Sequence, residues 1–186
     1  MGSLREDVKQ AYVARFGEDM WRQHLKSIDD VWSAIRQILS VLKLSYDAVR
    51  LYQDGLPVCG KEFEIVQDVA VKGSINHQLL LELIAQGAQL EGTEDPSLLM
   101  EEYRLHQDPL KRTQLNAEKT EVESSEKLLM RRDKFIAGRI NSTLRMGEVG
   151  LLFLGLAHSI DSFLDEDILV RHLLPSMREK QGFARA

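Results

Sequence analysis

The chain has 186 residues, of which 44% are hydrophobic and 28% are charged, with a formal net charge of −5 and a single cysteine. The length suits one domain with a sizeable core, and the composition is that of a globular protein rather than a disordered one. The acidic balance argues against a dedicated nucleic-acid-binding protein, because phosphate contacts need a basic face. The single cysteine, Cys59, excludes an intrachain disulfide.

The sequence predicts no membrane-spanning segment. The longest apolar run, residues 149–157, is too short to cross a bilayer and is interrupted by glycine. The N-terminal segment turns charged at Arg5, which is unlike a signal peptide. We therefore expect a cytoplasmic protein, and one cysteine fits a reducing compartment.

The N-terminal part is predicted to be helical. Residues 4–16 form a short amphipathic segment that ends at Gly17. Further along, large apolar side chains recur at alternating spacings of four and three residues, which predicts one apolar stripe on a helix. The stripe consists of Trp21, Leu25, Ile28, Trp32, Ile35, Leu39 and Leu42. Ser27 starts a capping pattern, so the region is either one helix or two helices divided there.

The apolar stripe fits two roles. Side chains at these spacings pack into the core of an ordinary domain. The same heptad spacing is typical of a helix that pairs with a second copy of itself. The second role predicts a homo-oligomer formed through Trp21, Trp32 and Leu39.

Short strands alternate with helices in the rest of the chain. Strands are predicted at residues 48–52, 88–91 and 149–154, and helices at 63–70, 74–84, 97–106 and 116–146. The third strand is continuously apolar, which is typical of a strand buried on both faces. Residues 168–170 are either an edge strand or a short helix. The alternation predicts a helix-rich α/β fold with a parallel or mixed sheet of few strands flanked by helices, and one domain over residues 1–186.

Polar side chains follow each predicted strand. Asp54 follows the first strand, Glu94 the second and His158 the third. The carboxyl ends of parallel strands meet at one edge of a sheet, where ligands bind. Two carboxylates and a histidine can bind a divalent metal ion or serve as acid and base. We therefore predict that Asp54, Glu94 and His158 line one pocket; the alternative is that they are ordinary turn residues.

Residues 55–62 match the frame of the phosphate-binding loop G-x-x-x-x-G-K-[ST], except at the last position. Glu62 stands where a hydroxyl would bind magnesium, and its charge would repel phosphate. Pro57 removes one N–H donor from the loop. Both departures argue against nucleotide hydrolysis. Cys59, within the loop, is expected to be a buried small residue, with a thiol of lowered pKa as the alternative.

A longer motif resembles a known family. The helical segment Arg132-Asp133-Lys134-Phe135-Ile136-Ala137-Gly138-Arg139-Ile140 precedes a hydrophobic strand that closes on Gly155-Leu156-Ala157-His158. This pattern resembles the C-terminal signature of the TraB / Tiki / ChaN / erythromycin-esterase-like superfamily, in which an arginine-containing helix leads into a strand ending in G-x-x-H. The resemblance covers residues 128–160. The remainder agrees only in the order of its elements and its acidic strand ends.

The resemblance implies a hydrolase-like pocket with a divalent metal as its cofactor, because members of the superfamily are similar to metal-dependent peptidases, an esterase and haem- or iron-associated lipoproteins. His158 and Arg132 match the motif of the superfamily by position, whereas Asp54 and Glu94 would be acidic pocket residues only by analogy. On this basis His158, Asp54 and Arg132 would be catalytic, and His158, Asp54 and Glu94 would bind the metal. Arg132 would hold an anion or a carbonyl group, although a salt-bridged surface is the alternative from the residues alone. The ligand would be a small molecule or a peptide. The other function that we consider is a non-catalytic interaction module that dimerises through the N-terminal stripe.

The sequence departs from the superfamily pattern at its start. The superfamily carries its first G-x-x-H motif on an opening strand, and this sequence opens with a predicted helix. We therefore expect that an upstream strand with a second histidine is missing from the sequence.

Overall fold

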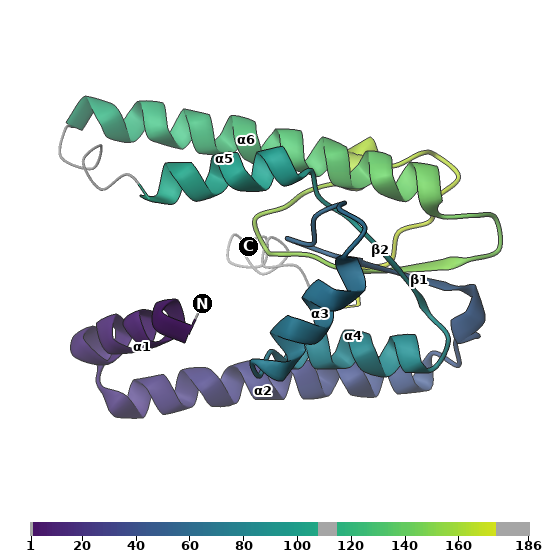
Figure 1. The fold of residues 1–186 in the computed structure, drawn as a ribbon, viewed down its shortest axis with the longest axis horizontal. Coiled ribbons are helices and arrows are strands. Elements are labelled where there is room, and N and C mark those ends of the chain that lie inside the picture. Colours follow the sequence, from purple (N-terminus) through teal and green to yellow (C-terminus); the bar gives the residue numbers. More distant parts are fainter. Residues whose placement is uncertain (1, 108–114, 174–186) are drawn as a thin grey trace, which may run out of the picture. The chain divides into compact units, whose positions relative to one another are not determined.

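The computed structural model describes residues 2–107 and 115–173 (Figure 1). The chain divides into two compact units, Met1–Lys43 and Leu44–Ala186. Two compact units can belong to one folding domain, so the expected single domain over residues 1–186 stays a prediction.

The first unit is a pair of helices, α1 (Gly2–Phe16) and α2 (Glu18–Val41). Gly17 joins them with a φ of 87°, a left-handed conformation that glycine adopts without steric cost. The ring of Tyr12 in α1 lies 5.4 Å from the ring of Trp21 in α2. Aromatic contacts therefore hold the two helices together.

Helix α2 is continuous from end to end, so a division at Ser27 is wrong. The hydroxyl of Ser27 donates a hydrogen bond to the carbonyl oxygen of Gln23, one helical turn earlier, at 2.9 Å. A serine that bonds back to its own helix does not cap a new one. The whole apolar stripe up to Leu39 therefore lies on one helix.

The second unit contains a three-stranded parallel sheet in the order β2-β1-β3. Its strands are β1 (Val49–Gln53), β2 (Gln89–Glu91) and β3 (Val149–Phe153). Leu51 in β1 pairs with Leu90 on one side and Leu151 on the other. The predicted helix-rich α/β fold with a small sheet flanked by helices is confirmed.

The central strand is β1, and all of its residues are buried. The prediction that the third strand is buried on both faces is wrong, because β3 is an edge strand whose first residues, Val149 and Gly150, are exposed. An edge strand has a neighbour on one side only, and this leaves part of its surface open to solvent.

Helices cover both faces of the sheet, with α5 and α6 on one side and α3 and α4 on the other (Figure 1). Their bounds are Glu62–Val71 for α3, Ile75–Ala85 for α4, Pro96–Gln107 for α5 and Leu115–Thr143 for α6. The described residues also contain two short 3-10 helices, η1 (Tyr46–Ala48) and η3 (Asp161–Phe163). Among the helices of residues 2–107 and 115–173, none combines the length with the apolar character that a membrane span requires.

Tyr52 of β1 packs on the face that α6 covers. Its buried side chain belongs to one core cluster with Ile136, Ala137 and Ile140 of α6. The hydroxyl of Tyr52 lies 2.8 Å from the hydroxyl of Thr143 and is thereby satisfied. The face of α6 that carries Ile136, Ala137 and Ile140 therefore packs against the sheet.

Two local predictions are wrong. Residues 168–170 form neither a strand nor a helix. Cys59 is exposed rather than buried, because it lies in the loop between β1 and α3.

Candidate functional site

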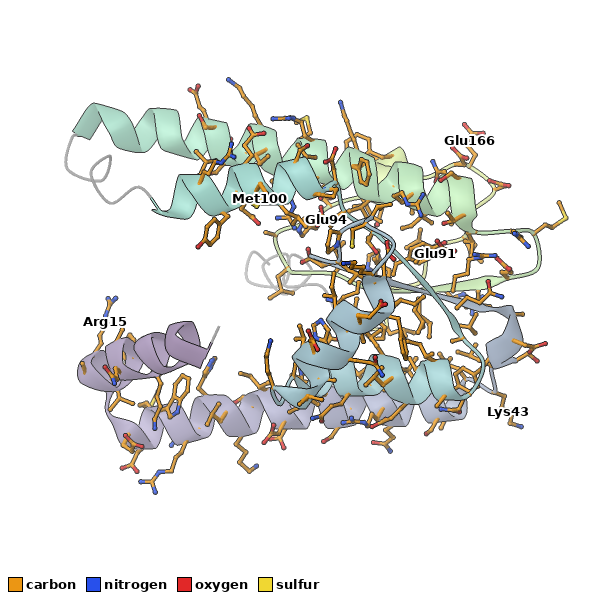
Figure 2. The ribbon with its side chains drawn as sticks, viewed as in Figure 1. Arg15, Lys43, Glu91, Glu94, Met100 and Glu166 are labelled. Atoms are coloured by element: carbon orange, nitrogen blue, oxygen red, sulfur yellow. The ribbon has the colours of Figure 1, made fainter. Side chains whose placement is uncertain are left out.

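The polar residues that follow the three strands converge at one edge of the sheet. Asp54 comes directly after β1, and His158 follows β3. Glu94 lies where the chain passes from β2 to α5 (Figure 2). One ligand atom from each of the three side chains lies within 4.8 Å of the other two. The structure therefore brings together the three residues that the sequence placed in one pocket.

The backbone around Glu94 is held by the loop that follows β1. The N–H of Glu94 donates to the carbonyl oxygen of Leu56, and its own carbonyl accepts from the N–H of Val58, both at 2.9 Å. Pro57 and Glu94 thereby form a parallel bridge. This extra pairing beyond β2 carries the Glu94 side chain into the interior, where none of its surface is exposed.

Arg132 of α6 joins the carboxylates of the site. Its Nη2 donates to Glu94 Oε1 at 2.5 Å and to Asp54 Oδ1 at 2.9 Å, and its Nε donates to Glu94 Oε2 at 3.2 Å. Its Nη1 donates to Glu102 Oε1 of α5 at 2.6 Å. Arginine has five N–H donors, so four of them are bound to carboxylates here.

The neighbouring Arg131 differs from Arg132 in its exposure and in its partner. Arg131 is exposed and forms a surface salt bridge with Glu101 at 2.9 Å. Arg132 points inward and is 5% exposed. Arg131 therefore forms a surface salt bridge, whereas Arg132 reaches the carboxylates at the strand ends. The expectation that Arg132 holds an anion or a carbonyl group stays a prediction.

His158 lies between two aspartates. Its Nε2 is 3.4 Å from Asp54 Oδ1, and its Nδ1 is 2.5 Å from Asp133 Oδ1. The second oxygen of Asp133 accepts the backbone N–H of Ser159 at 3.0 Å. Gly155 donates its N–H to Asp54 Oδ2 at 3.1 Å, which ties the loop after β3 to the end of β1.

Asp133 was not among the predicted site residues. A signal for it exists in the sequence, because Asp133 lies three, four and seven residues before Ile136, Ala137 and Ile140. These spacings place it on the apolar face of α6 that packs on the sheet. A charged residue on such a face is buried only when it has a partner.

The pKa values of the site follow from burial and from these contacts. Burial acts to raise the pKa of Asp54, but the hydrogen bond with His158 and the nearby charge of Arg132 lower it to about 2. Burial raises the pKa of Glu94, against the opposing effect of Arg132. Burial acts to lower the pKa of His158, but its hydrogen bonds to Asp54 and Asp133 raise it above the ordinary value.

Negative charge is in excess at the site. The carboxylates of Asp54, Glu94 and Asp133 surround one guanidinium and one imidazole, and Glu102 adds a fourth carboxylate. When all four are ionised, they outnumber the positive groups even if His158 is protonated. Such a field attracts cations and repels anions.

The loop of residues 55–62 does not offer a phosphate site. Glu62 Oε1 accepts the N–H groups of Cys59 at 2.8 Å and of Gly60 at 3.0 Å. Burial acts to raise the pKa of Glu62, but the hydrogen bond from Cys59 and its neighbours lowers it. The Glu62 carboxylate therefore occupies backbone N–H donors that a phosphate would need. This agrees with the argument against nucleotide hydrolysis.

Comparison with known proteins does not assign this site to a family. No protein-family model, no curated protein and no solved structure matches the chain. The resemblance of residues 128–160 to the TraB / Tiki / ChaN / erythromycin-esterase-like superfamily stays a prediction.

Proposed function

We propose that the protein has a hydrolase-like centre that binds a divalent metal ion through Asp54, Glu94 and His158. The observation that carries this proposal is the approach of their three ligand atoms to within 4.8 Å of one another. Two carboxylate oxygens and one imidazole nitrogen are a donor set that zinc, manganese and iron accept, and three protein ligands leave a position for water. A bound metal would lower the pKa of that water and make it a nucleophile at neutral pH.

The charge of the site supports a cation as its ligand. Glu94 is fully buried, and Arg132 compensates only part of the negative charge around it. A divalent cation would neutralise most of the remainder. Within this proposal, Arg132 orients the two carboxylates by holding Asp54 and both oxygens of Glu94.

A catalytic role for Arg132 toward the substrate is a separate part of the proposal. One of its five N–H donors is not bound to the carboxylates of Asp54, Glu94 and Glu102. That donor, on Nη1, is the group that would polarise a carbonyl of a small-molecule or peptide substrate. The excess negative charge argues against a strongly anionic substrate at this position.

We also propose kinship with the TraB / Tiki / ChaN / erythromycin-esterase-like superfamily. Support comes from two features of the matching segment. The G-x-x-H motif at Gly155–His158 follows β3 after one residue, and Arg132 lies on the helix before it. The side chains of Arg132 and His158 both contact Asp54, so the two motif residues act on one group.

Calorimetric titration with Mn²⁺, Zn²⁺, Co²⁺ and Fe²⁺ tests the metal site. We expect the wild type to bind at least one of these ions and His158→Ala to lose that binding. His172→Ala is the matched control, because His172 is an exposed histidine paired with Asp161. Failure of the wild type to bind any of the four ions would reject the metal centre, and unchanged binding by His158→Ala would reject the ligand set.

Hydrolysis is tested separately with the metal-loaded protein. A panel of ester and peptide substrates should show turnover by the wild type that is lost in Asp54→Asn. Turnover that persists in this variant would come from a contaminant or another site and would overturn the proposed centre.

An interaction module is the second candidate function. It is favoured by the apolar stripe, which lies on the single continuous helix α2 from Trp21 through Trp32 to Leu39. We propose that two copies of the chain pair through this stripe. Sedimentation of the wild type and of Trp32→Glu separates the outcomes: a dimer that the variant loses supports pairing, two monomers reject it, and an unfolded variant indicates core packing.

A further inference from the structure

We propose that Asp133 is a positioning residue that fixes the tautomer of His158, so that Nε2 is the nitrogen with a free electron pair. Asp133 Oδ1 lies 2.5 Å from His158 Nδ1. The side chains are 7% and 4% exposed, respectively, so water does not compete for this contact. The importance of Nε2 rests on the proposed function, whereas the tautomer itself does not.

The carboxylate of Asp133 can only accept hydrogen bonds when it is ionised. The hydrogen between the two groups therefore belongs to His158, on Nδ1. In the neutral imidazole, Nε2 then carries the electron pair, and it faces Asp54 Oδ1 at 3.4 Å. A metal-binding histidine commonly has its other nitrogen held by a carboxylate in this way.

Asp133 also accepts a hydrogen bond whose direction is fixed, because a backbone N–H can only donate. The backbone N–H of Ser159 donates to Asp133 Oδ2 at 3.0 Å. Because Ser159 directly follows His158, one carboxylate of α6 binds both the imidazole and the adjacent backbone. This arrangement fixes the position of the ring as well as its tautomer.

The backbone donor also determines what an asparagine would do at this position. In Asp133→Asn, the amide oxygen is required to accept the N–H of Ser159. The amide NH₂ then faces His158 Nδ1, which has to become an acceptor. A neutral His158 would therefore carry its hydrogen on Nε2, and the electron pair would point away from Asp54. The substitution keeps the size of the side chain while exchanging the tautomer.

Nitrogen-15 NMR of the imidazole distinguishes the tautomers directly, at a pH where His158 is neutral and without any metal. We expect Nδ1–H in the wild type and Nε2–H in Asp133→Asn, with the signal assigned by its loss in His158→Gln. Asp161→Asn is the matched control, because it alters an exposed aspartate–histidine pair at His172. In this control, His158 should keep the wild-type tautomer.

A second readout is metal affinity. If the proposed metal site exists, Asp133→Asn should bind the metal about 10- to 100-fold more weakly, whereas Asp161→Asn should bind like the wild type. An Nε2–H tautomer in the wild type, or an unchanged tautomer in Asp133→Asn, would overturn the inference. If Asp133→Asn does not fold, as judged by circular dichroism, the wild-type tautomer alone decides.

The two proposals fail in different ways. Absence of metal binding together with an Nδ1–H tautomer would reject the proposed function and leave the role of Asp133 intact. Metal binding together with an Nε2–H tautomer would support the proposed function and reject the role of Asp133.

Discussion

Arg132 joins the carboxylate of Glu94 through both of its oxygens, with N–O distances of 2.5 and 3.2 Å. The Glu94 side chain is fully buried, and that of Arg132 is 6% exposed. Burial removes both charges from water, which is unfavourable unless each has a partner of opposite charge. Asp54 and Glu102 complete the contacts of Arg132, so one guanidinium from α6 stabilises carboxylates from three other segments.

Arg132→Met should destabilise the fold strongly. The variant leaves the buried Glu94 without its partner, and breaking a buried ion pair from one side costs about 3–5 kcal/mol. The free energy of unfolding from urea titration measures the loss. Arg131→Met is the matched control, because Arg131 and its partner Glu101 are exposed. It should change the free energy by less than about 1 kcal/mol. Equal effects of the two substitutions would contradict the buried network.

Asp54 should make the fold sensitive to acid. Its pKa is lowered from 3.8 to about 2, so the folded state favours the ionised form. The resulting stabilisation is present above the unfolded pKa and is lost as the pH falls through the folded pKa. Its size is about 2 kcal/mol, from the free energy equivalent of a pKa change.

Urea titrations at several pH values compare the wild type with Asp54→Asn, which does not titrate. The difference in their free energies of unfolding should shrink as the pH falls from 3.8 to about 2. A difference that is constant over this interval would show that the carboxylate of Asp54 has no lowered pKa.

The meeting of Asp54 and His158 could be predicted from the sequence. Both follow strands of a parallel sheet, and the carboxyl ends of such strands share one edge. The structure adds the reason that they are so close: β1 and β3 are direct neighbours, and the N–H of Asp54 continues their pairing by donating to the carbonyl of Phe153 at 2.9 Å. Strand order is a long-range property that local patterns do not contain.

The identity of the central strand could not be predicted from hydrophobicity. The apolar run in β3 suggested burial, whereas β1 carries a charged residue, Arg50, at its second position. Arg50 is nonetheless 4% exposed, because Glu91 and Glu148 from two other segments bind its guanidinium. A buried charge is compatible with a central strand when partners distant in sequence are present. No spacing rule connects these three residues.

Asp133 was missed for a related reason. The sequence places it on the inward face of α6, but its partner depends on how the loop after β3 returns to the helix. His158 is separated from it by 25 residues. The pattern on the helix face therefore indicates that Asp133 is buried. Only the tertiary structure identifies the His158 imidazole as its partner.

Gly155→Ala should disturb the site. A Cβ at this position would lie 2.8 Å from Asp54 Oδ2, closer than two such atoms approach. The Asp54 carboxylate would have to move, which would weaken its bond to the N–H of Gly155 and its contact with His158. We expect weaker metal binding in calorimetry and a modest loss of stability.

Gly138→Ala is the control for Gly155→Ala. Gly138 lies inside α6, and a Cβ there would meet nothing within 4 Å. Alanine in an exposed helix interior is about 0.5–1 kcal/mol more favourable than glycine. This variant should therefore be more stable than the wild type and bind the metal equally well. A Gly155→Ala variant that behaves like Gly138→Ala would show that Asp54 accommodates the extra methyl group.

His158 should stabilise the fold in its protonated form. Hydrogen bonds to Asp54 and Asp133 outweigh the effect of burial and raise its pKa above 6.5 in the folded state. The folded state therefore binds the proton more tightly than the unfolded state. The stabilisation is fully present below the unfolded pKa and is lost as the pH rises through the folded pKa. The free energy of unfolding of the wild type relative to His158→Gln should accordingly fall with rising pH above 6.5.

His77 provides a control of the opposite sign. Burial lowers its pKa below 6.5, so the folded state favours the neutral imidazole. Its contribution is present above the unfolded pKa and is lost as the pH falls through the folded pKa. The free energy of unfolding of the wild type relative to His77→Gln should therefore rise with pH. The free energy of unfolding of the wild type relative to His158→Gln should fall with pH. Equal slopes for the two variants would mean that the carboxylates of Asp54 and Asp133 do not hold a proton on His158.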